Sequence, residues 1–228
     1  MITLFGEGRG FRIAWLLEEM GLPYRLRPVD MLAGVENDPE FMAINPGGFI
    51  PAIQDGKTIM VESIAIMEYL MGRYGPTPLA PEPRDPAFPA YQQFLHLGEA
   101  GLATPIFITV VSQILAPEAE RDNWGARKGQ AMFTGRLALV TRQLAREPYM
   151  AGKTFTAADI SVTYALQFAQ RTVNYSLGDL ELAYIDRTTA REAYKRAMDT
   201  CQATKAWAES IDRQSRTSQS SSVQPHTT

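Results

Sequence analysis

Polar residues that could bind a charged ligand stand together at one point in the first third of the chain. Glu62 and Ser63 lie where an apolar strand pattern gives way to a helical one. A hydroxyl and the free N–H groups at a helix start suit a carboxylate, and a side-chain carboxylate suits an ammonium group. The pair is therefore a candidate site for a ligand that carries both charges, although such a pair alone most often only starts a helix. The competing interpretation is that these two residues only begin a helix.

A second candidate is the glycine-rich loop Gly6-Glu7-Gly8-Arg9-Gly10 near the N-terminus. Arg9 carries a fixed positive charge, and the N–H groups of Gly10 and Phe11 are expected at the start of the first helix, where they favour an anion. Arg9 and Gly10 are therefore candidate catalytic residues; the alternative is a solvated arginine on a tight turn. The glycine spacing does not fit a dinucleotide fingerprint, which also needs an acidic residue about 20 positions further on.

Composition excludes several classes of function. The net charge of −3 and the pI near 5.5 argue against nucleic acid as the main partner. The single cysteine, Cys201, rules out an internal disulfide and a two-cysteine redox motif, and we expect it to be a small buried residue. The chain contains only two histidines, His96 and His226, in addition to this cysteine, so we expect no metal site. We also expect no membrane span, because no apolar run reaches 18 residues, and a cytoplasmic location.

Proline density marks the domain organisation. Residues 76–89 hold six of the fifteen prolines, so we expect a stiff linker there. The predicted domains are 1–75 and 90–212, followed by a flexible polar tail at 213–228 that is rich in Ser, Thr and Gln.

Hydrophobic periodicity predicts the elements that position these residues. Strand patterns cover 2–5, 24–29, 50–54 and 58–61, with a turn at Asp55-Gly56. Helical patterns cover 13–20, ended by Gly21 and Pro23, then 39–44 and 64–74. The order β-α-β-α-β-β-α predicts a small α/β domain. Beyond the linker the chain is predicted to be helical, with a kink at Pro105.

Two segments at a fixed mutual spacing resemble a known family. Residues 45–52, Asn-Pro-Gly-Gly-Phe-Ile-Pro-Ala, resemble the glutathione transferase segment N-P-x-G-x-(I/V)-P-A. Residues 61–70 are similar to its E-S-x-A-I-x-x-Y-L segment, and residues 11–24 to its first helix in bacterial and fungal members. Thr156 and Asp159 match its helical-domain capping motif, which is a capping box with Asp in place of Glu. The resemblance extends to about Ser210.

The resemblance implies a thioredoxin-like α/β N-terminal domain (βαβαββα) followed by an all-α domain. It implies a cis Ile50-Pro51 bond, so that the Ile50 backbone pairs with the cysteinyl part of glutathione as an added strand. It also implies a two-fold homodimer, glutathione as co-substrate without a metal, and a role in detoxification. The expected glutathione-binding residues are Phe49, Ile50, Pro51, Glu62 and Ser63.

The chain departs from the family where the thiol is activated. Family enzymes place Tyr, Ser or Cys just after the first strand, whereas residues 6–12 contain none of them, and the family serine falls at Gly8 or Gly10. Two functions therefore stay open. One is an enzyme whose glutathione thiolate attacks a small apolar electrophile; the other is a non-catalytic binding module. We expect the acceptor pocket in a cleft between the domains, with Thr104, Phe107 and Tyr164 as candidates.

Overall fold

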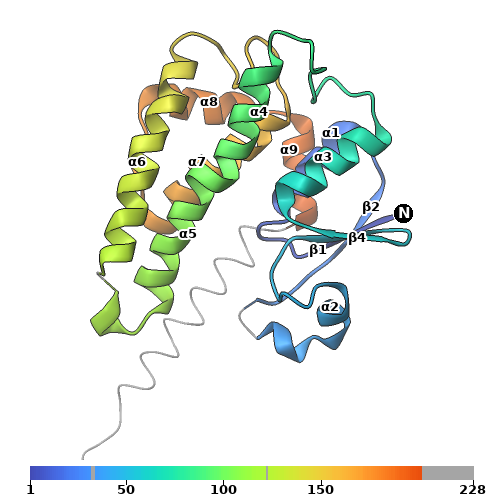
Figure 1. Ribbon diagram of the computed structural model, residues 1–228, viewed down its shortest axis with the longest axis vertical. Helices are drawn as coiled ribbons and strands as arrows, with labels where there is room; N and C mark the ends of the chain where they lie inside the picture. The colour runs from blue at the N-terminus through green and yellow to red at the C-terminus, as the bar shows by residue number, and fades with distance from the viewer. Residues whose placement is uncertain (32–33, 122, 202–228) are drawn as a thin grey trace, which may run out of the picture. The chain divides into compact units, whose positions relative to one another are not determined.

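The computed structural model describes residues 1–31, 34–121 and 123–201, so the predicted tail at 213–228 lies outside the described residues. The first elements along the chain are β1 (Ile2–Phe5), α1 (Phe11–Met20), β2 (Tyr24–Arg27), η1 (Val35–Asn37), α2 (Pro39–Ile44), β3 (Ala52–Asp55), β4 (Thr58–Val61) and α3 (Ser63–Tyr74). They are followed by α4 (Phe88–His96), η2 (Leu97–Ala103), α5 (Thr104–Val110), η3 (Val111–Leu115), η4 (Glu118–Glu120), α6 (Trp124–Leu144), α7 (Ala157–Val173), α8 (Asp179–Thr189) and α9 (Glu192–Cys201). The predicted βαβαββα order followed by helices is confirmed (Figure 1).

Packing divides the chain into two compact units. Of the described residues, one unit contains Met1–Ser63 together with Arg196–Cys201, and the other contains Ile64–Lys195. This grouping places α3 with the helices. The sequence-based boundaries of 1–75, 76–89 and 90–212 stay a prediction.

The first unit is built on a four-stranded mixed sheet with the strand order β2-β1-β3-β4. β1 pairs with β2 in parallel, and the α1 crossover connects them; β3 pairs with β1 and with β4 in antiparallel register. Phe5 lies opposite Ala52, and Ala52 lies opposite Val61. These three residues therefore form one row across the sheet, and the segments next to them meet at the same sheet end.

Alternate residues of β1 face the helices on the two sides of the sheet. Figure 1 shows α1 and α2 on opposite faces. Phe5 packs toward α2, with its ring centroid 6.2 Å from that of Phe41. Leu4 points to the other face, where its side chain approaches Gly10 just before α1. β1 is buried throughout, as a central strand covered on both faces must be.

α1 ends where the sequence predicts. Gly21 has φ +64°, and the N–H of Leu22 donates to the Leu17 carbonyl oxygen at 2.9 Å, which closes the last turn. Seven of the ten residues of α1, from Phe11 to Leu17, are buried. The helix is thus a core element. The glycine loop therefore runs between two buried elements, β1 and α1.

α2 is held to the sheet by one carboxylate. Asp38 accepts a hydrogen bond from the Phe41 N–H at 3.0 Å, and it also pairs with the Arg27 guanidinium on β2. Arg27 holds the pKa of Asp38 below its ordinary value. Because α2 leads directly into the loop at residues 45–49, this contact positions that loop relative to β2.

The helical unit contains a widened turn where a kink was predicted. Pro105 has no N–H to donate to the carbonyl oxygen one turn earlier, and the preceding residues, Leu97–Ala103, form a π-helix. The Gly101 carbonyl accepts instead from the Arg136 guanidinium on α6 at 3.3 Å. The missing backbone hydrogen bond is therefore replaced by a side chain from a neighbouring helix.

The predicted capping box at the start of α7 is present. The Thr156 N–H and the Met150 N–H each donate to the Asp159 carboxylate at 2.8 Å. Its other donors are the Tyr184 hydroxyl at 3.0 Å and the Thr156 hydroxyl at 3.2 Å. Asp159 is fully buried, so one carboxylate joins α7, α8 and the turn at residue 150.

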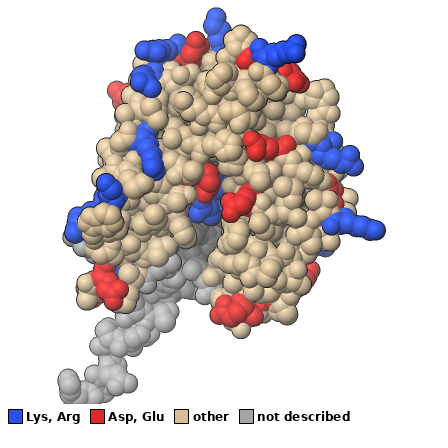
Figure 2. Space-filling view, in the orientation of Figure 1, with Lys and Arg blue, Asp and Glu red and all other residues tan. Residues whose placement is uncertain are grey.

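Among the described residues, one helical stretch, Phe88–Gln113, is long and apolar enough to span a membrane, although 56% of its apolar window is buried inside the protein. Core helices of soluble proteins meet the same criterion, so the stretch is weak support for a membrane span. On the face in Figure 2, acidic and basic side chains of the described residues are interspersed. An extended basic surface is not visible on that face.

Candidate functional site

Three segments with candidate residues meet at one end of the sheet. Ile50-Pro51 leads into β3 at Ala52, Glu62-Ser63 leaves β4 after Val61, and the glycine loop starts after Phe5. Since Phe5, Ala52 and Val61 form one row, these segments leave the sheet at the same place. The structure therefore brings together the residues predicted to bind glutathione and the glycine loop.

The glycine loop packs directly against Ile50. A Cβ atom at Gly6 would lie 2.4 Å from the Ile50 Cγ2 atom, which leaves no room for a side chain. A Cβ atom at Gly8 would lie 3.5 Å from Ile50 Cδ1, which is ordinary van der Waals contact. Gly8 is thus the glycine of this loop at which a Cβ atom fits, next to Ile50.

The Ile50 backbone is available to a ligand. The Ile50-Pro51 bond is cis, as the family resemblance implied. Within the described part of the chain, the Ile50 N–H and C=O make no hydrogen bond. Because Ile50 precedes the first residue of β3, its donor and acceptor extend the hydrogen-bonding edge beyond the strand.

Glu62 has an unusual backbone conformation. Its φ is +68°, in the left-handed region that non-glycine residues rarely adopt and that costs about 1–3 kcal/mol. The strained residue joins β4 to α3, with its side chain exposed, while Ser63 is buried as the first residue of α3. Strained backbone of this kind concentrates at binding and catalytic sites.

Two polar groups of the glycine loop and the start of α1 are already hydrogen-bonded within the protein. The Phe11 N–H, which we expected at an anion, donates to the Gly8 carbonyl at 3.3 Å. The Glu7 carboxylate accepts from the Val29 N–H at 3.2 Å and ties the loop to the segment after β2. Arg9 is half-buried at the middle of the loop. The charge of Arg9 and the N–H of Gly10 are the other anion-stabilising groups that the sequence predicts in this loop.

The sequence marked Asn45 only as part of the family motif and predicted no separate role for it. In the structure Asn45 is buried and closes the loop before Ile50 with both ends of its side chain. The Asn-Pro-Gly-Gly run was the available signal, because Asn side chains commonly hydrogen-bond their own backbone two residues further on.

We expect Gly10→Ala to destabilise the first unit by about 2–3 kcal/mol. A Cβ atom at Gly10 would lie 1.9 Å from the Gly6 carbonyl oxygen, so the backbone of the loop must shift. Gly8→Ala is the matched control, and we expect a change within about 0.5 kcal/mol there. Urea unfolding of the three proteins checks this; equal losses for both variants would contradict it.

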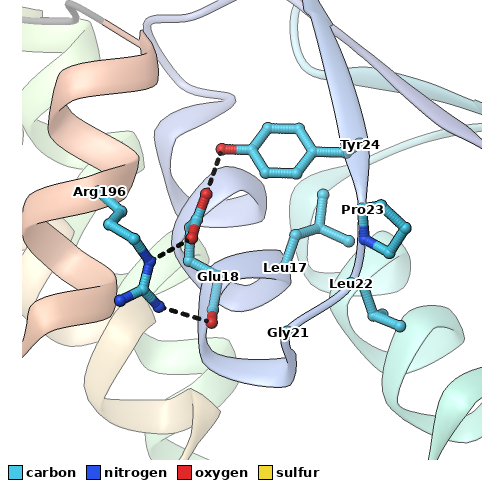
Figure 3. A pocket seen from close by; sticks show the side chains of 7 residues that line it. All are labelled: Leu17, Glu18, Gly21, Leu22, Pro23, Tyr24 and Arg196. Carbon is cyan, nitrogen blue, oxygen red and sulfur yellow. Dashed lines mark hydrogen bonds and ion pairs between the residues drawn. The ribbon is translucent and has the colours of Figure 1, made fainter.

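A surface hollow of about 390 Å³ lies at the other end of α1 (Figure 3). Its wall contains Glu18, which accepts from Arg196 at 2.7 Å and from the Tyr24 hydroxyl at 3.2 Å. None of the predicted site residues lines this hollow. Cys201 is buried, as predicted. Burial, with the charges of Glu7 and Glu18, raises the pKa of its thiol to about 12.

Comparisons with known proteins decide the family. The family model described as glutathione S-transferase, N-terminal domain, matches residues 10–72. Glutathione S-transferase 3 of Schizosaccharomyces pombe is 30% identical over 182 residues, covering 72% of each chain. The chain belongs to the glutathione S-transferase family.

Solved structures are also similar to this chain. A theta class glutathione S-transferase from Xanthomonas axonopodis pv. citri, described with glutathione bound, is 27% identical. It matches with a TM-score of 0.72 over 86% of this chain and 96% of its own. The transferase URE2P8 of Phanerochaete chrysosporium has a TM-score of 0.76 over 90% of this chain and 96% of its own. At 21% identity, that match supports the fold alone.

The predicted acceptor residues of this family member lie on helices of the second unit. Phe107, on α5, is 41% exposed, and the Thr104 hydroxyl donates to Glu99 at 3.4 Å. Tyr164, on α7, stacks on Phe168 with ring centroids 6.0 Å apart. Their role in an acceptor pocket stays a prediction. Among the residues described, no group of three or more His, Cys, Asp or Glu side chains could hold a metal ion.

Proposed function

We propose that the protein is a glutathione transferase that binds glutathione at the sheet end described above and attacks a small apolar electrophile with its thiolate. One observation carries the proposal. The Ile50 backbone, Glu62, Ser63 and the glycine loop leave the sheet at one place, and the Ile50 backbone makes no hydrogen bond with the described residues. The relative described with glutathione bound supports it.

The ligand's groups match those of the site. The cysteinyl part of glutathione adds to Ile50 like a further strand, with Phe49 and Pro51 beside it. The Glu62 carboxylate takes the ammonium group of the γ-glutamyl end. The Ser63 hydroxyl and the N–H groups at the start of α3 take its carboxylate. The two neighbouring residues thus bind the two opposite charges of one amino-acid end.

The chemistry proposed is nucleophilic attack by sulfur. The thiol proton leaves to solvent, and the thiolate forms a C–S bond while a leaving group such as halide departs with its electron pair. Alternatively, it adds to an activated double bond, which takes up a proton. The Arg9 charge and the Gly10 N–H lower the thiol pKa by favouring the anion. Binding also fixes the sulfur in place for attack.

An ultraviolet titration of bound glutathione tests this function. We expect the thiol of bound glutathione to ionise at lower pH than the free thiol, and Arg9→Ala to raise its pKa. Gly8→Ser should lower that pKa further, because the space beside Ile50 accepts a side chain and the hydroxyl can donate to sulfur. Arg25→Ala, which removes an exposed cation on β2, is the control and should leave the titration unchanged. No binding at millimolar glutathione would overturn the proposed site.

The second candidate function is a binding module without catalysis. The absence of Tyr, Ser and Cys from residues 6–12 favours it. In that case glutathione binds but titrates as it does in free solution, and a chlorodinitrobenzene probe is not consumed faster than without protein. The same two measurements therefore separate the enzyme from the module.

The proposal includes a cellular location, an oligomeric state and the absence of certain partners. We place the protein in the cytoplasm as a two-fold homodimer, without a metal, nucleic-acid or membrane partner. The family resemblance supports the dimer. Size-exclusion chromatography with light scattering measures it, and a mass of 25.3 kDa would show a monomer instead.

A further inference from the structure

Asn45 makes four hydrogen bonds, two through its side chain and two through its backbone. Its Oδ1 accepts from the Gly47 N–H at 3.0 Å, and its Nδ2 donates to the Phe49 carbonyl oxygen at 2.6 Å. Its own N–H donates to the Phe41 carbonyl at the end of α2, and its carbonyl accepts from the Gly48 N–H. Asn45 is 4% exposed. The residue therefore fixes the whole loop from the end of α2 to Phe49.

The contact with Phe49 acts on Ile50 through one peptide group. The Phe49 carbonyl and the Ile50 N–H belong to the same planar peptide unit, in which a trans bond points them in opposite directions. The cis bonds of the described chain are Ile50-Pro51 and Gly75-Pro76, so the Phe49-Ile50 bond is trans. Holding the carbonyl therefore sets the direction of the Ile50 N–H. A hydrogen bond to the carbonyl also polarises the unit and strengthens the N–H as a donor.

We propose that Asn45 is a positioning residue that aims and polarises the Ile50 N–H toward the cysteinyl carbonyl of glutathione. The inference rests on the proposed function, in which Ile50 binds that part of the ligand. A purely structural residue would only end α2 and close the loop. The difference is that a positioning residue affects one donor of the site and leaves Glu62 and Ser63 unchanged.

Two substitutions separate these roles. Asn45→Asp keeps the acceptor for the Gly47 N–H but replaces the Nδ2 donor with an oxygen that repels the Phe49 carbonyl. Asn45→Ser is a neutral second variant whose hydroxyl accepts locally but is too short to reach Phe49. Asn123→Asp is the matched control: the Asn123 side chain accepts from the Ala126 N–H and donates to the Glu120 carbonyl, and it lies in the helical unit.

The experiment measures glutathione affinity by calorimetry and the backbone amide shifts by NMR in the full-length protein. In wild type, glutathione should shift the Ile50 and Ser63 amides. In both Asn45 variants we expect a Kd roughly tenfold higher, with the Ser63 shift retained at saturation and the Ile50 shift largely lost. The Asn123→Asp control should behave as wild type.

Each other outcome is decisive. If wild type binds glutathione and both Asn45 variants bind with unchanged Kd and an unchanged Ile50 shift, the positioning role is wrong while the proposed function stands. Loss of the Ile50 and Ser63 shifts together, with a large fall in Tm, would show that Asn45 is only structural. If wild type does not bind glutathione, the proposed function itself fails, and the inference fails with it.

Discussion

Asp159→Ala should lower the free energy of unfolding of the helical unit by about 3–5 kcal/mol. The carboxylate accepts from the Met150 and Thr156 N–H groups and from the Tyr184 hydroxyl, all in a fully buried position. Alanine leaves these donors without an acceptor and without access to water. It also removes the capping box that starts α7.

Denaturant unfolding at pH 7 measures this loss, and Asp186→Ala on α8 is the control. Asp186 is exposed, so its removal should change stability by no more than about 0.5 kcal/mol. A loss below about 1 kcal/mol for Asp159→Ala would contradict the prediction, because the Asp159 network would then add little to the fold.

The pH dependence of the same site provides a second readout. Burial raises the pKa of Asp159 to about 6, against the opposing effect of its hydrogen-bond donors. Between about pH 4 and 6 the folded protein therefore keeps a proton that the unfolded chain has released. This group's contribution to the free energy of unfolding falls as pH rises through that window and is constant above it. Asp159→Asn cannot titrate, so its difference from wild type should change there; a constant difference would contradict the raised pKa.

Glu62→Gln and Ser63→Ala should each weaken glutathione binding by about 10- to 100-fold. Each removes a charge-assisted hydrogen bond to one end of the γ-glutamyl group, and such bonds contribute about 1.5–3 kcal/mol. Ser63 is buried at the start of α3, so its side chain loses less conformational entropy on binding than an exposed one would. Calorimetric titration with glutathione measures both effects.

Two controls make the result specific. Glu68→Gln, further along α3 and 41% exposed at its side chain, should bind glutathione as wild type does. Glu62→Gly should lose affinity while gaining stability, because glycine adopts φ +68° without strain. Unchanged affinity in Glu62→Gln and Ser63→Ala would move the site away from the start of α3.

Features decided by local chemistry could be predicted from the sequence. Four such features depend on neighbouring residues and are present in the structure. They are the Asp55-Gly56 turn, the end of α1 at Gly21, the short helix Pro39–Ile44 and the Thr156/Asp159 capping box. The convergence of Ile50, Glu62-Ser63 and the glycine loop at one sheet end follows from the strand register, which the structure shows. The roles of the individual site residues stay predictions.

Features decided by packing could not be predicted in this way. The Asn45 contact with Phe49 depends on how the loop folds back after α2, and a sequence shows only that an Asn precedes Pro-Gly-Gly. Pro105 indicated a broken hydrogen bond, but the π-turn and the Arg136 replacement depend on which helix lies alongside. Strand 24–29 ends at Arg27, because the next residues lead to the loop held by Glu7 rather than along the sheet.

The first unit is interrupted in the sequence. The chain leaves it at Ser63 and returns at Arg196, where the guanidinium pairs with Glu18 at the C-terminal end of α1. On the ribosome, the strands that lead into the proposed glutathione site are therefore synthesised more than 130 residues before the part of α9 that completes their unit. A fragment that stops at the proline-rich segment lacks that helix. Expressing the two sequence halves separately therefore divides a unit that the native chain assembles only after α9 has been synthesised.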